Sequence, residues 1–120
     1  MAPVIRSLKA YVPSKDFELS KRFYSALGFN MTPGWGGTAD FEINGCQFRL
    51  QNEYVKDWAE NFMFVIEVDD LQAWYQLAQQ VQAQAEFKKS VRITPPQIVD
   101  GVFTVLHVVD PTGVLLVFVQ

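Results

Sequence analysis

Apolar residues recur at helical spacing in two stretches of the chain, and each stretch follows an acidic residue that can cap a helix. The spacing predicts one helix over residues 16–27, ended by Gly28, and a second helix over residues 69–85. Asp16 and the pair Asp69-Asp70 can accept hydrogen bonds from first-turn N–H groups. These acidic residues are therefore interpreted as caps and not as an acid–base pair.

Shorter apolar and alternating runs predict strands before and after each helix. Asn44-Gly45 predicts a tight hairpin turn because a type I′ turn needs two residues with positive φ. A second turn is expected at Asp110-Pro111-Thr112-Gly113. One further strand is expected near Pro95-Pro96, where the pattern does not define its position. The other expected strands cover residues 4–12, 29–32, 40–43, 46–51, 62–68, 103–109 and 114–119.

The order of these elements repeats along the chain. A β-α-β-β-β unit over residues 1–55 is followed by a second one over residues 60–120. We therefore expect an α+β fold with one domain over residues 1–120, made of two βαβββ modules. Each module would be a curved sheet with a helix on its convex face, and the concave faces would enclose a cup. The last strand, residues 114–119, is apolar on both faces, so it must be core on one side and face core or an apolar cavity on the other.

Composition narrows the classes of partner. Charged residues make up 19% of the 120 residues and the net charge is −3, whereas a nucleic-acid-binding surface would be basic. The single cysteine, Cys46, excludes an intrachain disulfide and fits a reducing compartment. The N-terminal stretch does not have the pattern of a signal peptide, and no apolar run approaches the ~18 residues of a membrane span. A cytoplasmic protein with no nucleic-acid or membrane partner is expected.

Three segments resemble the vicinal oxygen chelate superfamily, which includes glyoxalase I, extradiol dioxygenases, and fosfomycin and bleomycin resistance proteins. They are LSKRFYSALGF (19–29), VIEVDDLQAWYQLA (65–78) and DPTGVLLVF (110–118). The resemblance covers nearly the whole chain and implies the cup-shaped fold of two βαβββ modules. In catalytic members it also implies a divalent metal, held in the cup by His, Glu or Gln side chains from four strands.

Carried over to this sequence, the four metal-ligand positions fall on Ser7, Arg49, Met63 and Val117. The second position falls on Gln51 instead if the register slips by two. Divalent metals need converging oxygen or imidazole donors, whereas a guanidinium repels a cation and valine offers no donor. The resemblance is therefore closest to the metal-free bleomycin-resistance-like members, and we expect no metal, no cofactor and no catalytic residue. Those members also imply a homodimer with cavities between subunits and strands that can exchange.

A small organic ligand remains the expected partner, because the cup would have one polar and one apolar wall. Arg49 is interpreted either as a binding group for a carboxylate or phosphate, or as the partner of Glu67 or Glu42. Trp35 is interpreted as a stacking lid or as an anchor against a dimer partner. The expected ligand-binding residues are Ser7, Tyr11, Trp35, Arg49, Gln51, Met63, Glu67 and Val117.

The leading hypothesis is a metal-free small-molecule binding protein resembling bleomycin resistance proteins, which sequester a ligand and do not transform it. One alternative is a glyoxalase-like lyase or dioxygenase with unfamiliar metal ligands, for instance Glu67, His107 and another carboxylate. Another is an interaction module whose cup is filled by its own side chains. Apart from these alternatives, His107 is predicted to be a core or interface residue, and Cys46, Trp58 and Trp74 are predicted to be structural.

Overall fold

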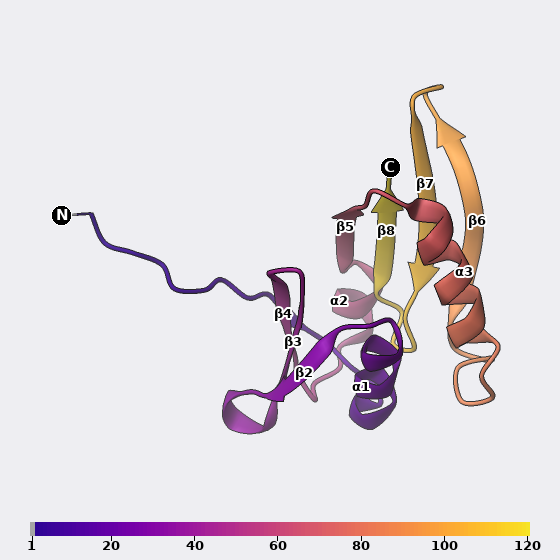
Figure 1. The fold of residues 1–120 in the computed structure, drawn as a ribbon. Helices are drawn as coiled ribbons and strands as arrows, with labels where there is room; N and C mark the ends of the chain where they lie inside the picture. Colours follow the sequence, from indigo (N-terminus) through magenta and orange to yellow (C-terminus); the bar gives the residue numbers. More distant parts are fainter. Residues whose placement is uncertain (1) are drawn as a thin grey trace.

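The computed structural model describes residues 2–120 and contains two four-stranded sheets with helices packed against them (Figure 1). In the first sheet, which we call sheet A, the strand order is β1-β4-β3-β2, with β1 parallel to β4 and the other pairs antiparallel. Its elements are β1 (Tyr11–Val12), α1 (Phe17–Ala26), β2 (Asn30–Pro33), β3 (Ala39–Ile43) and β4 (Cys46–Leu50).

The second half of the chain repeats this arrangement as sheet B, with the order β5-β8-β7-β6 and β5 parallel to β8. A short helix, α2 (Lys56–Glu60), links the two halves. The elements of sheet B are β5 (Met63–Glu67), α3 (Leu71–Gln82), β6 (Arg92–Val99), β7 (Phe103–Val109) and β8 (Leu115–Val119). The α+β fold class and the repeated βαβββ order are therefore confirmed.

The capping residues act as the sequence predicts. Asp16 Oδ1 accepts a hydrogen bond from the Leu19 N–H at 3.1 Å, and Asp70 Oδ1 accepts one from the Ala73 N–H at 3.0 Å. The α3 helix ends at Gln82, three residues before the predicted end. The hairpin turn is also confirmed, because Asn44 and Gly45 have φ values of 52° and 83°.

The first predicted strand is wrong over most of its length. Residues 2–10 form an extended arm that leaves the body of the molecule (Figure 1), and β1 is limited to the two residues that pair with Arg49 and Leu50. Val4, Ile5 and Leu8 on this arm are each more than 75% exposed. The alternating pattern indicates a strand, but a strand needs a neighbour for its N–H and C=O groups.

The strand that the sequence could not place is β6, at the edge of sheet B. It contains Pro95 and Pro96, and its pairing with β7 shifts register between Thr94 and Gln97. Proline lacks an N–H to donate, so it is tolerated at an edge strand and at a bulge.

Polar and aromatic contacts join the two halves of the chain on the helix-covered side of the sheets. The Tyr24 hydroxyl of α1 donates a 2.6 Å hydrogen bond to Asp110 Oδ2 in the β7–β8 turn, and both residues are fully buried. Ser20 and Thr112 lie 3.2 Å apart through their hydroxyl oxygens. The Phe48 and Phe64 rings, one from each sheet, lie 5.2 Å apart between centroids. The two sheets are therefore held together from their helix-covered sides.

Alternate residues of each strand point to opposite faces. On β8, Leu116 and Phe118 are buried toward α3, where Trp74 stacks on Phe118 at 5.1 Å between centroids, while Val117 points to the other face. The apolar terminal strand is thus core on one face only. We use "cup face" for the side of each sheet that points away from its helix.

Candidate functional site

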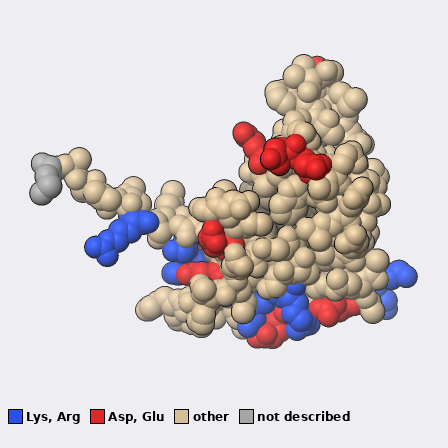
Figure 2. All heavy atoms as spheres, in the orientation of Figure 1, with Lys and Arg blue, Asp and Glu red and all other residues tan. Residues whose placement is uncertain are grey.

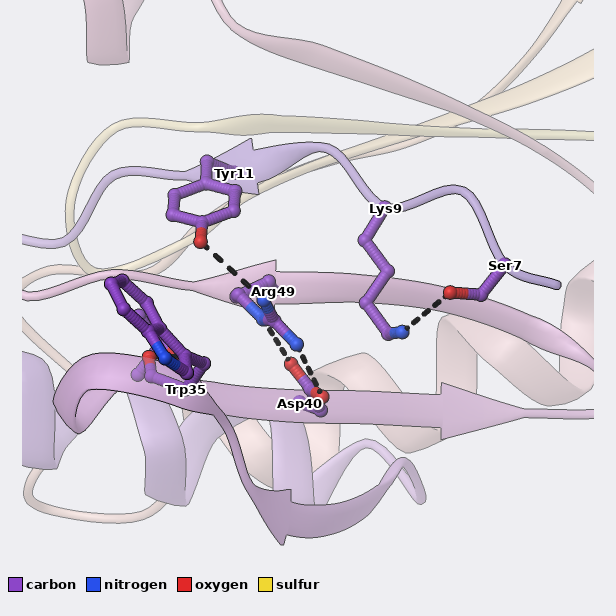
Figure 3. Close-up of polar contacts among 7 residues, drawn as sticks. Ser7, Lys9, Tyr11, Trp35, Asp40 and Arg49 are labelled. Atoms are coloured by element: carbon purple, nitrogen blue, oxygen red, sulfur yellow. Dashed lines mark hydrogen bonds and ion pairs between the residues drawn. The ribbon is translucent and has the colours of Figure 1, made fainter. Parts of the chain in front are cut away.

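On the cup face of sheet A, Arg49 of β4 forms the centre of a polar cluster (Figure 3). Its Nε donates to Asp40 Oδ1 at 2.7 Å and its Nη2 to Asp40 Oδ2 at 3.0 Å. Its Nη1 donates to Tyr11 Oη at 3.4 Å, and the guanidinium lies 5.6 Å from the centre of the Tyr11 ring. Arg49 pairs directly with Asp40 across the β3–β4 ladder, so the partner is Asp40 and not Glu42 or Glu67.

This ion pair shifts the ionisation of both groups. The hydrogen bonds from Arg49 hold the pKa of Asp40 below its ordinary value, against the opposing effect of partial burial. The hydrogen bond to Asp40 in turn raises the pKa of Arg49. Both groups are therefore charged across the neutral range, and the cluster carries a fixed ion pair and not a titrating base.

The other sequence-predicted residues near sheet A lie farther toward its edges. Ser7 lies on the exposed arm, where its Oγ accepts a hydrogen bond from Lys9 Nζ at 3.1 Å (Figure 3). Trp35 is 78% exposed, on a single 3₁₀ turn (Trp35–Gly37) between β2 and β3. Gln51 follows β4, and its N–H donates to the Val12 carbonyl at 2.9 Å.

On the cup face of sheet B the exposed side chains are mainly apolar. Met63 and Val65 of β5 are 57% and 66% exposed, and Val117 of β8 lies beside Val65 in the ladder. Glu67 closes β5 and is exposed. The structure thus places Met63, Glu67 and Val117 together on one sheet, and Tyr11, Arg49 and Gln51 along neighbouring strands of the other.

The structure places the histidine, two tryptophans and the cysteine that were predicted to be structural. His107 is exposed on the cup face, between Thr94 and Val117 in the ladder, which excludes the core and leaves the interface as its predicted role. Trp58 on α2 is 68% exposed and does not pack inside the chain, whereas Trp74 does. Cys46 is a free, exposed cysteine beside the hairpin turn. Odd-numbered residues of β7 point to the cup face. The sequence does not reveal this, because the residues on both sides of His107 are apolar and show no alternation of polar and apolar positions.

The donor set does not fit the divalent metal that catalytic relatives hold in the cup. Three of the four expected metal-ligand positions carry Ser7, Met63 and Val117, and the fourth, Arg49, places a positive charge on the cup face of sheet A. Within residues 2–120, His, Cys, Asp and Glu side chains do not gather in a group of three that could hold a metal ion. His107 and Glu67 lie on different strands that are separated by β8.

A hollow with a volume of about 680 Å³, open to solvent on one side, lies between the helix-covered sides of the two sheets. We call it the inter-sheet cleft. Five exposed residues line it: Val65 of β5 and four that we call the rim, namely Asn44 and Cys46 at the β3–β4 turn, and Glu67 and Asp69 where β5 leads into α3. Its walls are rich in aromatic side chains, namely Tyr24, Phe29, Phe48, Phe64, Trp74 and Phe118. This cleft could not be predicted from the sequence, because its residues come from strands and helices that are far apart in the chain.

The structure is similar to solved structures of ligand-binding proteins and of one enzyme. A bleomycin resistance determinant encoded on the transposon Tn5 matches with a TM-score of 0.78 and 25% identity, covering 97% of this chain and 98% of that one. A bleomycin-binding protein from bleomycin-producing Streptomyces verticillus, complexed with copper(II)-bleomycin, matches with a TM-score of 0.73 and 20% identity, over 96% and 97% of the two chains. Lactoylglutathione lyase from Agrobacterium tumefaciens matches with a TM-score of 0.68 and 12% identity, over 98% and 94%.

Comparison of the sequence with protein-family models gave no match, and neither did comparison with curated protein sequences. In residues 2–120, no helix has the length and apolar character that crossing a membrane requires. The shared architecture extends over nearly the full length of both the bleomycin-binding proteins and the lyase. The chain therefore has the glyoxalase/bleomycin resistance fold, which is the fold of the vicinal oxygen chelate superfamily.

Proposed function

We propose that this protein binds a small organic molecule in a cup formed between two copies of the chain, without using a metal. The observation that carries the proposal is the pair of contrasting cup faces. Sheet B offers exposed apolar area at Met63 and Val65, and sheet A offers the ordered Arg49–Asp40–Tyr11 cluster. Apolar area supplies affinity and a few fixed polar groups supply orientation. The proposed ligand-contacting residues are Ser7, Tyr11, Trp35, Arg49, Gln51, Met63, Glu67 and Val117.

A second copy is part of the proposal because one chain leaves both cup faces uncovered. The arm has strand-like alternation and exposed apolar residues, but within residues 2–120 only the carbonyl of its last residue, Ala10, bonds to a neighbouring strand, at the Arg49 N–H of β4. Exchange of the arm between two copies would give its backbone groups a partner. A homodimer would also cover the sheet B cup face, since exposed apolar patches of this kind mark interaction surfaces. Trp35 then lies either over the cup mouth or against the partner.

Similarity to the bleomycin-binding proteins supports sequestration of a ligand as the activity. The chemistry of Ser7, Arg49, Met63 and Val117 supports binding without metal, because none of them is a suitable ligand for a hard divalent cation. The free Cys46 is compatible with a reducing, cytoplasmic compartment. The contacts between Tyr24 and Asp110 support treatment of residues 1–120 as one domain.

A thermal-shift screen of a panel of organic ligands that includes bleomycin tests the proposal. A ligand at about 100 times its Kd adds about 2.7 kcal/mol to the free energy of unfolding. Each kcal/mol raises Tm by about 4 °C for a chain of this size. We therefore expect at least one ligand to raise Tm by about 10 °C. Failure of every ligand to shift Tm would favour an interaction module over a small-molecule binder.

A matched pair of variants locates the binding surface. Met63→Glu places a charge on the apolar cup wall, and Val102→Glu places the same charge at the exposed tip of the β6–β7 hairpin, where Val102 is 73% exposed. We expect M63E to abolish most of the ligand-induced shift and V102E to leave it intact. Equal shifts in both variants would contradict a ligand site on the cup face.

Elemental analysis of protein purified without chelator separates the proposal from the rival enzyme. We expect less than stoichiometric divalent metal. One bound metal ion per chain would instead support a lyase or dioxygenase that uses ligands at unfamiliar positions.

A further inference from the structure

The inter-sheet cleft lies on the opposite side of both sheets from the cup. Phe48 and Phe64 alternate along their strands with Arg49 and Val65, which point to the cup faces, so the aromatic residues point away from them. A ligand in the cleft would therefore contact mainly different side chains from a ligand in the cup, although Val65 and Glu67 of β5 line the cleft as well.

The cleft has the size and lining of a site for an organic molecule. A volume of about 680 Å³ is within the range of about 300–1,000 Å³ that is usual for ligand pockets. Phe48 and Phe118 are buried and form the floor, while Phe29, Phe64 and Trp74 are half-buried and remain able to contact a ligand. The Trp74 ring is already fixed by stacking on Phe118.

The charged residues at the rim of the cleft are acidic. Glu67 and Asp69 are exposed on one side of it, and of the described residues that line the cleft none is Lys or Arg. Figure 2 shows acidic side chains gathered where β5 leads into α3, the region in which Glu67, Asp69 and Asp70 are exposed. The faces of aromatic rings also attract cations.

We propose that the inter-sheet cleft is a second ligand site, which binds an aromatic molecule carrying a positive charge. The aromatic part would lie between Phe64, Trp74 and Phe29, and the charged group would lie at the rim near Glu67 and Asp69. This site does not depend on the cup, on a metal or on a second copy of the chain.

Three naphthalene probes of different charge test the choice of ligand. Calorimetric titration of the full chain is carried out with (2-naphthylmethyl)trimethylammonium, neutral 2-naphthylmethanol and anionic 2-naphthylacetate. We expect the cation to bind about tenfold more tightly than the anion, with the neutral probe between them. The negative charge of the rim is removed in the double variant Glu67→Gln, Asp69→Asn. Asp70 is left unchanged, because it caps α3. That variant is expected to lose the preference for the cation without losing the neutral probe.

The single cysteine gives a direct test of location. Cys46 lies at the rim and is free and exposed, so N-cyclohexylmaleimide should react with it and obstruct the cleft. We expect this modification to weaken binding of the cation about tenfold or more. As a control, a Cys46→Ser, Gln80→Cys variant carries the same group on the outer side of α3, where Gln80 is exposed, and should bind as the unmodified protein does.

Any of the following results would overturn this second site: no binding of the cation, equal affinity for all three probes, unchanged binding after Cys46 is modified, or failure of Cys46 to react. Ligand binding in the cup is tested separately from binding in the cleft. M63E should leave naphthyl binding unchanged, and modification of Cys46 should leave unchanged the Tm shift caused by a ligand identified in the thermal-shift panel. Loss of naphthyl binding in M63E would assign the probe to the cup and contradict the cleft site.

Discussion

The Arg49 guanidinium directs Nε and Nη2 to Asp40, which leaves Nη1, 3.4 Å from Tyr11 Oη, as its weakest engaged donor. A ligand with an acceptor group would meet Nη1 and the Tyr11 hydroxyl first. A ligand carboxylate that required both prongs of the guanidinium would have to displace Asp40. The geometry therefore favours one directed hydrogen bond to a ligand over a two-pronged contact.

Arg49→Gln should change the acid dependence of stability. The lowered pKa of Asp40 means that its ion pair stabilises the fold above the unfolded-state pKa of about 3.9 and that this contribution is lost as the pH falls through the lower folded-state value. In R49Q the pKa of Asp40 should rise, and the free energy of unfolding at pH 7 should fall by roughly 1 kcal/mol. Carboxyl NMR titration and urea unfolding at several pH values measure the two effects.

Arg22→Gln is the matched control for this substitution. Arg22 forms a 2.7 Å ion pair with Glu86, but both side chains are largely exposed, so its loss should scarcely change stability. If R49Q and R22Q have the same effect, the Arg49–Asp40 pair is only a surface contact and does not order the polar wall.

The buried Tyr24–Asp110 contact makes a second prediction at this scale. Asp110 also accepts hydrogen bonds from the backbone N–H groups of Thr112, Gly113 and Val114. Burial raises the pKa of Asp110, and these hydrogen bonds together with the one from Tyr24 oppose the rise. Tyr24→Phe removes one donor from a buried carboxyl group and should cost about 1–3 kcal/mol of unfolding free energy.

Tyr75→Phe serves as its control, because Tyr75 is only half-buried and the described residues provide no hydrogen-bond partner for its hydroxyl. Chemical denaturation of both variants gives the comparison. A loss in Y24F no larger than that in Y75F would show that the hydroxyl does not fasten α1 to the β7–β8 turn.

Local sequence signals predicted the elements whose geometry depends on a few neighbouring residues. The caps at Asp16 and Asp70 and the Asn44-Gly45 turn are of this kind, because each satisfies backbone groups or φ values within one turn. The strand β6 was not placed, because Pro95 and Pro96 resemble a loop until the neighbouring strand β7 is known. The arm was predicted as a strand, because alternation reports the faces of a strand but not whether a partner is present.

Deletion of residues 2–9 tests the role of the arm as an element. These residues lie outside the core, so the shortened chain should keep its helices and strands. If the arm is exchanged between copies, the full chain should be a dimer and the shortened chain should dissociate at micromolar concentration. Light scattering coupled to size exclusion measures the mass. If the full chain and the shortened chain contain the same number of chains per particle, arm exchange is contradicted.

For the whole molecule, the two binding surfaces that we propose lie on opposite sides of the sheets. The cup-face positions of Arg49, Met63 and Val117 could be predicted from the sequence, because side chains alternate between the two faces of a strand. The inter-sheet cleft could not be predicted, because it depends on how the two halves are packed through Phe48 and Phe64.

Native mass spectrometry of the full chain with bleomycin as a probe tests the central proposal most directly, because one spectrum reports subunit number, bound ligand and bound metal. We predict a dimer without protein-bound metal. A two-fold symmetric dimer has two equivalent cups, so up to two ligands should add to it. A monomer at micromolar concentration, or one divalent metal ion per chain in the absence of ligand, would contradict a metal-free cup formed between two copies.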